Sequence, residues 1–333
     1  MEEPRAFLGV GANPRGAPGN DPLLTEAYLD VLQGGFPVAA FRIDWGEIES
    51  RLANYTWTTV DDHVRQAIAR DVRLSVEVSL IDRTVLGTLP ADLRGQDLES
   101  TNLQVRFARF AQLLLARGQG RLDFLWIGRE VDRYIEGQLS PEEQRTALAE
   151  LLEATRDSLE SIELTLPIGT SLSATDLAGN SAAVAYQGIV DASDQIGWTV
   201  YGRDDLFVQS LSPEQTLELA QTAVETFPGV PAIVTEIGFP GEGRTDPAQV
   251  EFVSRLTGWL ESPPEDLLGA FFPWISDLHF TFARDRAARL FPDDKVRRGN
   301  LEGQLRSLGL KEENGVPTDA WRRVQSWNLE LPG

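Results

Sequence analysis

Residues 231–240 read Pro-Ala-Ile-Val-Thr-Glu-Ile-Gly-Phe-Pro, and residues 247–260 read Pro-Ala-Gln-Val-Glu-Phe-Val-Ser-Arg-Leu-Thr-Gly-Trp-Leu. The first stretch is an apolar, β-branched run of strand length with a proline at each end. In the second, apolar residues recur at intervals of three and four, and Pro247 stands at the first helical position, where its missing N–H costs nothing. This pair, a buried strand followed by a helix, is the unit that the rest of the chain repeats.

The same alternation runs from one end of the sequence to the other. The predicted strands are Ala6–Gly11, Val38–Asp44, Val72–Leu80, Leu122–Gly128, Ile162–Gly169, Gln195–Tyr201, Ala232–Ile237 and Gly269–Ile275. The predicted helices are Thr25–Gln33, Val60–Arg70, Leu103–Arg117, Pro141–Leu159, Ser181–Val190, Pro213–Thr226, Pro247–Leu260, Arg297–Leu308 and Thr318–Trp327, of which Ser181–Val190 has the weakest pattern. Eight strand–helix units predict an α/β fold, a single (β/α)₈ (TIM) barrel over residues 1–333. A doubly wound sheet is less favoured, because no Gly-x-Gly-x-x-Gly follows the first strand.

Composition excludes several classes of function. The 333 residues include 51 acidic and 30 basic side chains, for a net charge of -21, which argues against binding to nucleic acid or to anionic membranes. There is no cysteine, and the only histidines are His63 and His279, so we expect neither a metal site nor a cofactor. His63, at the start of a predicted helix, is expected on the surface. No apolar run approaches the roughly 18 residues of a membrane span.

The sequence leaves localisation and oligomeric state open. Residues 1–4, Met-Glu-Glu-Pro, have neither a basic segment nor an apolar one, so no signal peptide is visible. A secreted protein from which such a peptide has been removed is compatible with this start.

The candidate catalytic groups follow two of the predicted strands. Glu130 comes just after the fourth strand, and Glu236 ends the seventh. Active sites of (β/α)₈ barrels lie at the carboxyl ends of the strands, where the fourth and seventh face each other across the mouth. Two opposed carboxyl groups are the basic requirement of glycoside cleavage, and retaining enzymes hold them about 5–5.5 Å apart.

These segments resemble the retaining glycoside hydrolases of clan A. Val234–Pro240 is similar to their Thr-Glu-x-Gly-Trp-Pro motif, with Phe239 in place of Trp, and Ile127–Asp132 resembles the Gly-Asn-Glu-Val segment of the endo-β-1,4-galactanase and β-1,3-glucanase families. Further similar segments are Phe41-Arg42-Ile43, Tyr55-x-Trp57, Trp274, Gly309-Leu310, Asn314–Pro317 and Ala320-Trp321. The resemblance therefore spans almost the whole chain.

The resemblance implies a role for each matching residue. Glu130 would be the acid/base and Glu236 the nucleophile. Arg42 would keep Glu236 ionised, and Tyr201 would donate a hydrogen bond to it. Trp274 would form a platform beneath a sugar ring. For Arg42, an ion pair with a neighbouring carboxylate, Asp44 or Glu77, is the alternative. Trp45 and Trp198 are further candidates for the lining of the cleft, with a place in the core as the alternative.

Arg129 is a departure from the family pattern, because it stands where these enzymes have an asparagine that contacts the sugar 2-hydroxyl. An arginine there still donates hydrogen bonds to substrate, but it is longer and always charged. Beside Glu130 it would lower the pKa of a group that has to carry a proton.

The predicted function is retaining hydrolysis of a β-linked oligo- or polysaccharide, with transglycosylation as a variant of the same chemistry. The first alternative is a catalytically impaired barrel that binds carbohydrate or a partner protein through the same mouth. A phosphate-binding aldolase or isomerase barrel is less favoured, because the only lysines, Lys295 and Lys311, lie beyond the eighth strand.

Overall fold

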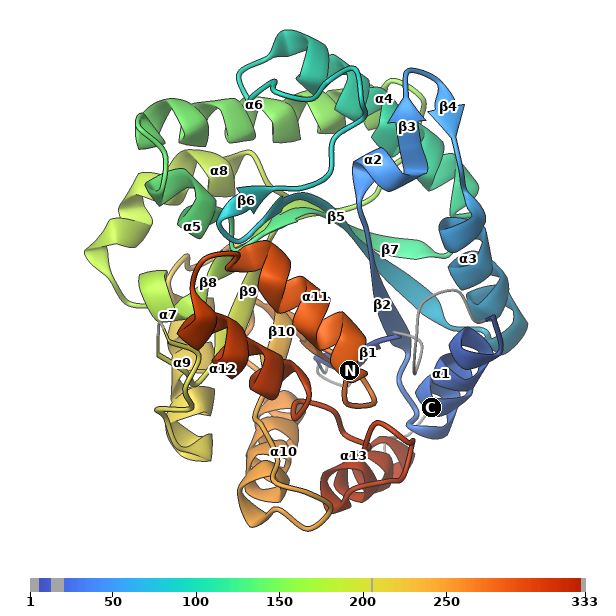
Figure 1. The fold of residues 1–333 in the computed structure, drawn as a ribbon, viewed down its shortest axis with the longest axis vertical. Coiled ribbons are helices and arrows are strands. Elements are labelled where there is room, and N and C mark those ends of the chain that lie inside the picture. Colours follow the sequence, from blue (N-terminus) through green and yellow to red (C-terminus); the bar gives the residue numbers. More distant parts are fainter. Residues whose placement is uncertain (1–5, 13–20, 205, 331–333) are drawn as a thin grey trace.

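The computed structural model describes residues 6–12, 21–204 and 206–330. Eight parallel strands close into a barrel (Figure 1), which confirms the predicted fold class. The barrel strands are β1 (Phe7–Gly11), β2 (Val38–Ile43), β5 (Arg73–Asp82), β7 (Leu122–Arg129), β8 (Ile168–Ser173), β9 (Gln195–Tyr201), β10 (Ala232–Gly238) and β11 (Leu267–Phe272). Each pairs with the next, and β1 closes the ring by pairing with both β11 and β2.

The predicted strands match the observed ones closely, with one exception. The fifth was predicted over Ile162–Gly169, but β8 begins only at Ile168. Residues 161–167 instead leave the preceding helix through a turn in which Glu163 has a φ of 57°, and Ile162 is exposed. The run was misplaced because its apolar residues resemble those of a strand, whereas the buried segment is the less apolar Gly169-Thr170-Ser171 that follows.

A ring of helices surrounds the barrel. Its members are α1 (Asp21–Gln33), α3 (Thr58–Arg70), α4 (Thr101–Arg117), α6 (Pro141–Glu160), α8 (Gln187–Asp191), α9 (Pro213–Glu225), α10 (Pro247–Glu261) and α13 (Asp319–Glu330). The weakly patterned crossover over Ser181–Val190 is a 3₁₀ helix, η1 (Ser181–Tyr186), followed by the short α8. Ser212 caps α9 in a reciprocal capping box with Gln215, which explains why this helix begins where the sequence predicted.

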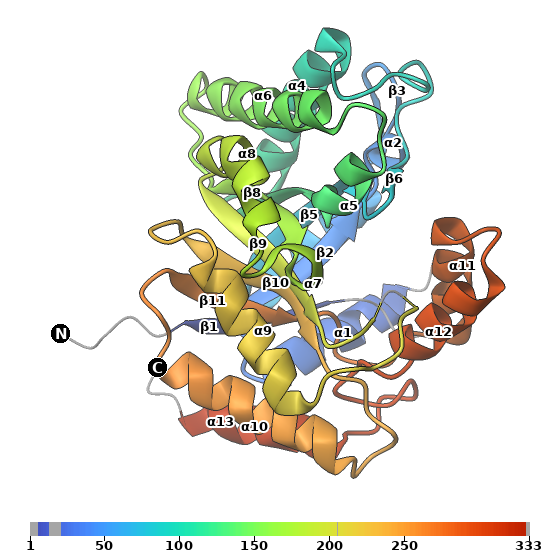
Figure 2. The ribbon, with the colours of Figure 1, turned by 90° about the vertical axis from the view of Figure 1, so that its left-hand side faces the viewer.

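Additional short elements decorate the carboxyl ends of the strands. They are α2 (Trp45–Ile48), the hairpin of β3 (Glu49–Arg51) and β4 (Asn54–Tyr55), β6 (Val85–Leu86), α5 (Val131–Glu136), α7 (Ala174–Leu177), α11 (Phe280–Leu290) and α12 (Lys295–Leu305). The sequence predicted α12 but not α11. Figure 2 shows α11 and α12 projecting together from one end of the barrel, apart from the helix ring. These two helices pack on Tyr201 and Trp274 in a separate apolar cluster.

The barrel interior is filled by large side chains from strands on opposite sides. Val38, Trp126, Ile233 and Phe271 form this inner cluster. Gly197 makes room for it, because a Cβ atom there would lie 3.0 Å from the Trp126 ring. This cluster fills the lower part of the barrel interior, as is usual for this fold. No helix among the described residues is long and apolar enough to cross a membrane.

Candidate active site

A cavity of about 580 Å³ opens at the carboxyl ends of the strands. Trp126 and Phe271 of the inner cluster line its inner end, and Trp274 lies on its wall. The charged side chains that line it are Arg42, Asp44, Glu47, Glu77, Glu236, Asp285, Arg286 and Arg289. A concave site with apolar and aromatic surfaces and a few charged groups is typical of a small-molecule or sugar site.

Glu236 presents its carboxylate to this cavity from β10. The pairing of β10 with β9 is irregular just before Glu236, a feature that re-aims side chains near active sites. Arg42 donates to its Oε1 at 2.7 Å, and Arg129 and Tyr201 each donate to its Oε2 at 2.7 Å. Burial raises the pKa of Glu236, but Arg129, Arg42 and the Tyr201 hydroxyl outweigh burial and hold the pKa at about 2. Glu236 is therefore ionised at neutral pH.

Arg42 makes both of the contacts that the sequence left open. Besides Glu236, it contacts Glu77 through two nitrogens, with Nε at 2.5 Å and Nη2 at 3.0 Å. The alternative partner Asp44 is paired with Arg289 instead, at 3.4 Å. Arg42 is thus a bridge between two carboxylates, one of which is the predicted nucleophile.

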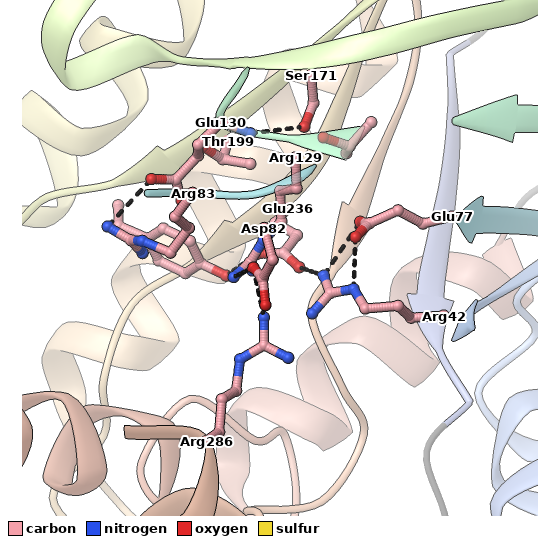
Figure 3. Close-up of polar contacts among 12 residues, drawn as sticks. Arg42, Glu77, Asp82, Arg83, Arg129, Glu130, Ser171, Thr199, Glu236 and Arg286 are labelled. Carbon is pink, nitrogen blue, oxygen red and sulfur yellow. Dashed lines mark hydrogen bonds and ion pairs between the residues drawn. The ribbon is translucent and has the colours of Figure 1, made fainter. Parts of the chain in front are cut away.

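Arg129 points toward Glu236 and not toward Glu130, the residue that follows it in the chain. Its Nη1 donates to Glu236 and its Nη2 donates to Asp82 Oδ1 at 2.9 Å. The side chain is 5% exposed and has carboxylate partners on both sides (Figure 3). The arginine that replaces the asparagine of the resembled families therefore contacts the predicted nucleophile, Glu236, directly.

Glu130 lies in a separate environment, behind the cavity wall. Its backbone adopts the left-handed conformation, with φ 44° and ψ 49°, which is uncommon for a residue other than glycine. Its carboxylate is 3.0 Å from Arg83, 3.1 Å from Arg133 and 3.8 Å from Arg203. The side chain is 2% exposed, and Glu130 is not among the described residues that line the cavity. Figure 3 shows it turned toward Arg83, away from Glu236.

The electrostatic environment of Glu130 opposes the predicted acid role. Burial raises the pKa of its carboxyl, but Arg83, Arg133, Arg129 and Arg203 together lower it below its ordinary value. A general acid needs the opposite shift. As placed, Glu130 is an ionised carboxylate without a proton to donate and without a surface on the cavity.

Comparisons with known proteins add the fold relationship. No family model and no curated protein matches the sequence. Among solved structures, a GH5_18 from Bifidobacterium longum subsp. infantis is 13% identical with a TM-score of 0.70, covering 98% of this chain and 79% of that chain. A GH5_18 variant from Streptomyces cattleya, in complex with Manβ1-4GlcNAc, is 15% identical with a TM-score of 0.70, covering 98% and 82%. The exo-β-1,4-mannosidase Op5Man5 from Opitutaceae bacterium strain TAV5 is 14% identical with a TM-score of 0.67, covering 97% and 59%. The chain has the fold of these glycoside hydrolases.

Within this glycoside hydrolase fold, the three predicted lining tryptophans have different positions. Trp274 lines the cavity just beyond the end of β11. Trp198 does not: on β9 it follows Gly197, which faces the barrel interior, so it points outward and stacks on Phe227 between barrel and helices. Trp45 does not line the cavity either. It begins α2, is fully buried and donates to Glu49 at 2.9 Å. Both belong to the core, which corrects their predicted placement.

His63 also differs from its prediction as a surface residue. It is buried, stacks on Phe41 and is hydrogen-bonded to the Tyr28 hydroxyl at 2.9 Å. Burial lowers its pKa to about 3, so the ring is neutral at physiological pH. The histidine lies on the buried face of α3, where it follows the three- and four-residue spacing of Val60, Val64 and Ala67. Among the described residues, no group of three or more His, Cys, Asp or Glu side chains could hold a metal ion.

Five charged residues of the site and its surroundings were not predicted from the sequence. They are Asp82, Arg83, Arg203, Arg286 and Arg289. Asp82 ends the third barrel strand, a position that signals an active-site residue in this fold. The two arginines of α11 had no signal, because α11 itself was not predicted.

Proposed function

We propose that the protein is a retaining glycoside hydrolase that cleaves a β-linked oligo- or polysaccharide with Glu236 as its nucleophile. The observation that carries this proposal is the ionised Glu236 carboxylate on the cavity wall, held at 2.7 Å by each of Arg42, Arg129 and Tyr201. The fold supports it, and so does a related GH5_18 structure that contains Manβ1-4GlcNAc, a β-linked disaccharide. Trp274 offers an apolar surface to a sugar ring.

The reaction follows from the chemistry of an anchored carboxylate. Glu236 attacks the anomeric carbon as the bond to the leaving oxygen breaks, and that oxygen takes a proton from an acid. Water then attacks the glycosyl-enzyme ester, returns a proton to the same group and frees Glu236. A sugar hydroxyl in place of water gives transglycosylation.

The proposal has two candidate donors for the leaving-group proton. Glu130 holds the position of the acid in the resembled families, but it would have to leave its arginines to reach the cavity. Glu47 lies on the cavity wall, and burial together with the neighbouring Asp44 raises its pKa, the direction that a general acid requires.

Reducing-end release from β-galactan, β-glucan, β-mannan and β-xylan tests the proposal, with wild type and Glu236→Gln compared side by side. Release by wild type that is lost in the variant supports it and identifies the glycan. Dinitrophenyl glycosides then separate the two donors, because so good a leaving group needs no proton. The variant of the true acid, Glu130→Gln or Glu47→Gln, should lose glycan cleavage but still release dinitrophenol as the glycosyl-enzyme forms. Azide should then speed the breakdown of the glycosyl-enzyme, because it attacks without the base that water needs.

A second function, carbohydrate binding without cleavage, is favoured by the arginines around Glu130. If wild type binds a glycan in calorimetry but releases neither reducing ends nor dinitrophenol, this function replaces the first.

A further inference from the structure

Asp82 is a buried carboxylate that three arginines share. It ends β5, its side chain is 0% exposed, and it does not line the cavity. Its Oδ1 accepts from Arg129 at 2.9 Å and from Arg286 at 3.2 Å, and its Oδ2 accepts from Arg289 at 2.7 Å. Figure 3 shows Asp82 between Arg129 above and Arg286 below. Burial raises the pKa of Asp82, but Arg286, Arg129, Arg42 and Arg289 keep it well below its usual range.

The three arginines lead from Asp82 in two directions. Arg129 uses its other terminal nitrogen on Glu236. Arg286 and Arg289 belong to α11, and both line the cavity. Asp82 is therefore the group through which the nucleophile and one wall of the cavity are joined, although β5 and α11 are about 200 residues apart in the chain, as the separation of 204 for the Arg286 contact shows.

Few other polar contacts hold α11 at this side. Arg289 also reaches Asp44, at 3.4 Å, but Arg286 has no other ion-pair partner among the described residues. The neighbouring face of the helix packs through Ala283, Ala287 and Leu290 into the apolar cluster that includes Trp274. That packing supports α11 without fixing how deeply its arginines reach toward Glu236.

We infer that Asp82 is a positioning residue, which holds Arg129 against Glu236 and anchors α11 as a wall of the sugar cavity. The catalytic half of this inference rests on the proposed function, whereas the anchoring half does not. The two effects are separable, because Arg129 lies on β7 and the other two arginines lie on α11, so substitutions on α11 leave the contact between Asp82 and Arg129 in place. If Asp82 had only a structural role, its substitution would lower the free energy of unfolding but would change neither the position of Arg129 nor the mobility of α11.

Three variants separate these effects. Asp82→Asn removes the shared charge and keeps the side-chain volume. The double variant Arg286→Gln/Arg289→Gln releases α11 and leaves the contact between Asp82 and Arg129 in place. Because both residues lie on a helix with one face toward solvent, this variant should fold even if Asp82→Asn does not. Asp285→Asn is the matched control: it lies on the same helix and lines the cavity, but its described ion pair is with the exposed Arg284.

Hydrogen–deuterium exchange tests the anchoring without any substrate. We expect the amides of residues 280–290 to exchange about tenfold faster in Asp82→Asn and in the double variant, and at the wild-type rate in Asp285→Asn. Exchange in α10 serves as the internal reference. Unchanged exchange of α11 in both folded variants would overturn the anchoring half.

Covalent trapping tests the link to Glu236. The probes are 2,4-dinitrophenyl 2-deoxy-2-fluoro-β-D-glucoside, -mannoside and -galactoside, and the glycosyl-enzyme is counted by intact mass. We expect the limiting trapping rate to fall about 10- to 100-fold in Asp82→Asn, because a misplaced reacting group costs that much. In Arg286→Gln/Arg289→Gln, the probe concentration that gives half the limiting rate should rise, because α11 forms a wall of the cavity, whereas the limiting rate should stay at the wild-type value.

The outcomes distinguish this inference from the proposed function. If wild type is trapped and Asp82→Asn is trapped at the same limiting rate, the catalytic half is wrong and the proposed function stands. If no probe traps wild type, the proposed function fails together with the catalytic half, and the exchange experiment still decides the anchoring half.

Discussion

Glu236 and Glu130 both stand at the carboxyl end of a barrel strand, are both buried and are both surrounded by arginines, yet their surroundings differ in one respect. Each arginine that contacts Glu236 has a second carboxylate: Arg42 has Glu77, and Arg129 has Asp82. Around Glu130, Arg83 and Arg203 have no other carboxylate within ion-pair distance among the described residues.

The difference suits the reactive role that we propose for Glu236 and a structural role for Glu130. Glu236 lines the cavity, and the charges of its two arginines are also balanced by Glu77 and Asp82. Among the described residues, Glu130 is the only carboxylate within ion-pair distance of the buried guanidiniums of Arg83 and Arg203, and burial lowers the pKa of Arg83 to about 9 even with Glu130 present. Removing Glu236 should therefore cost activity, and removing Glu130 should cost stability.

The largest effect is expected for Glu236→Gln. Loss of the attacking charge should lower the rate of glycan or dinitrophenyl glycoside cleavage by about 10,000-fold. Unfolding in urea should shift little, since Arg42 and Arg129 keep their second carboxylates. A large loss of stability with residual activity would reverse the comparison.

Glu130→Gln should mainly weaken the fold. The variant leaves Arg83 and Arg203 buried without a charge partner, so we expect a loss of about 3–5 kcal/mol in the free energy of unfolding. Urea titrations of this variant and of Glu236→Gln, run in parallel, measure the difference. Equal stability of the two variants would show that the arginines around Glu130 find other compensation.

Arg129→Asn should lower the activity, by about 10- to 100-fold, because it removes the guanidinium that Asp82 holds against Glu236. It also removes the cation that lowers the pKa of Glu236 most, so this pKa should rise from about 2 and the acidic limb of kcat/KM should move to higher pH. An unchanged or higher rate in the variant would show that Arg129 does not position Glu236 and that the asparagine of the resembled families serves the reaction better. Arg289→Gln, which keeps Arg129, is the control.

Asp132, two residues after Glu130, should make the free energy of unfolding depend on pH, and Asp132→Asn should remove this dependence. Burial raises the pKa of Asp132 to about 8, so between the unfolded value, about 4, and this value the folded state holds a proton that the unfolded state has lost. Stability contributed by this group therefore falls as pH rises, by about 1.4 kcal/mol per pH unit at most. The variant should remove that slope, as measured by urea unfolding between the two values, whereas Asp176→Asn, at a half-buried neighbour whose charge contributes less than burial to the pKa of Asp132, should keep most of it.

Much of the barrel could be predicted from local pattern. Gln195–Tyr201 was predicted to the residue, because a buried strand of a parallel sheet is a continuous apolar run. The fifth strand was misplaced, because Ile168–Ser173 is buried on both faces yet rich in small polar residues. The strand that contains Trp198 was predicted correctly, but the face on which Trp198 lies was not. That face follows from the position of Gly197 inside the barrel, against the Trp126 ring.

The sequence by itself determined the order of strands and helices and the carboxyl ends at which Glu130 and Glu236 stand, because periodicity and burial are local properties. The resemblance to clan A enzymes also placed Arg42 and Tyr201 near Glu236, and both contact it. Only the tertiary structure decided that Arg129 contacts Glu236, that Glu130 turns away and that Asp82 contacts both Arg129 and the arginines of α11. Those choices depend on ion pairs between residues that lie far apart in the chain, 107 positions for Arg129 and Glu236 and 204 for Asp82 and Arg286, and no local pattern records which charges meet.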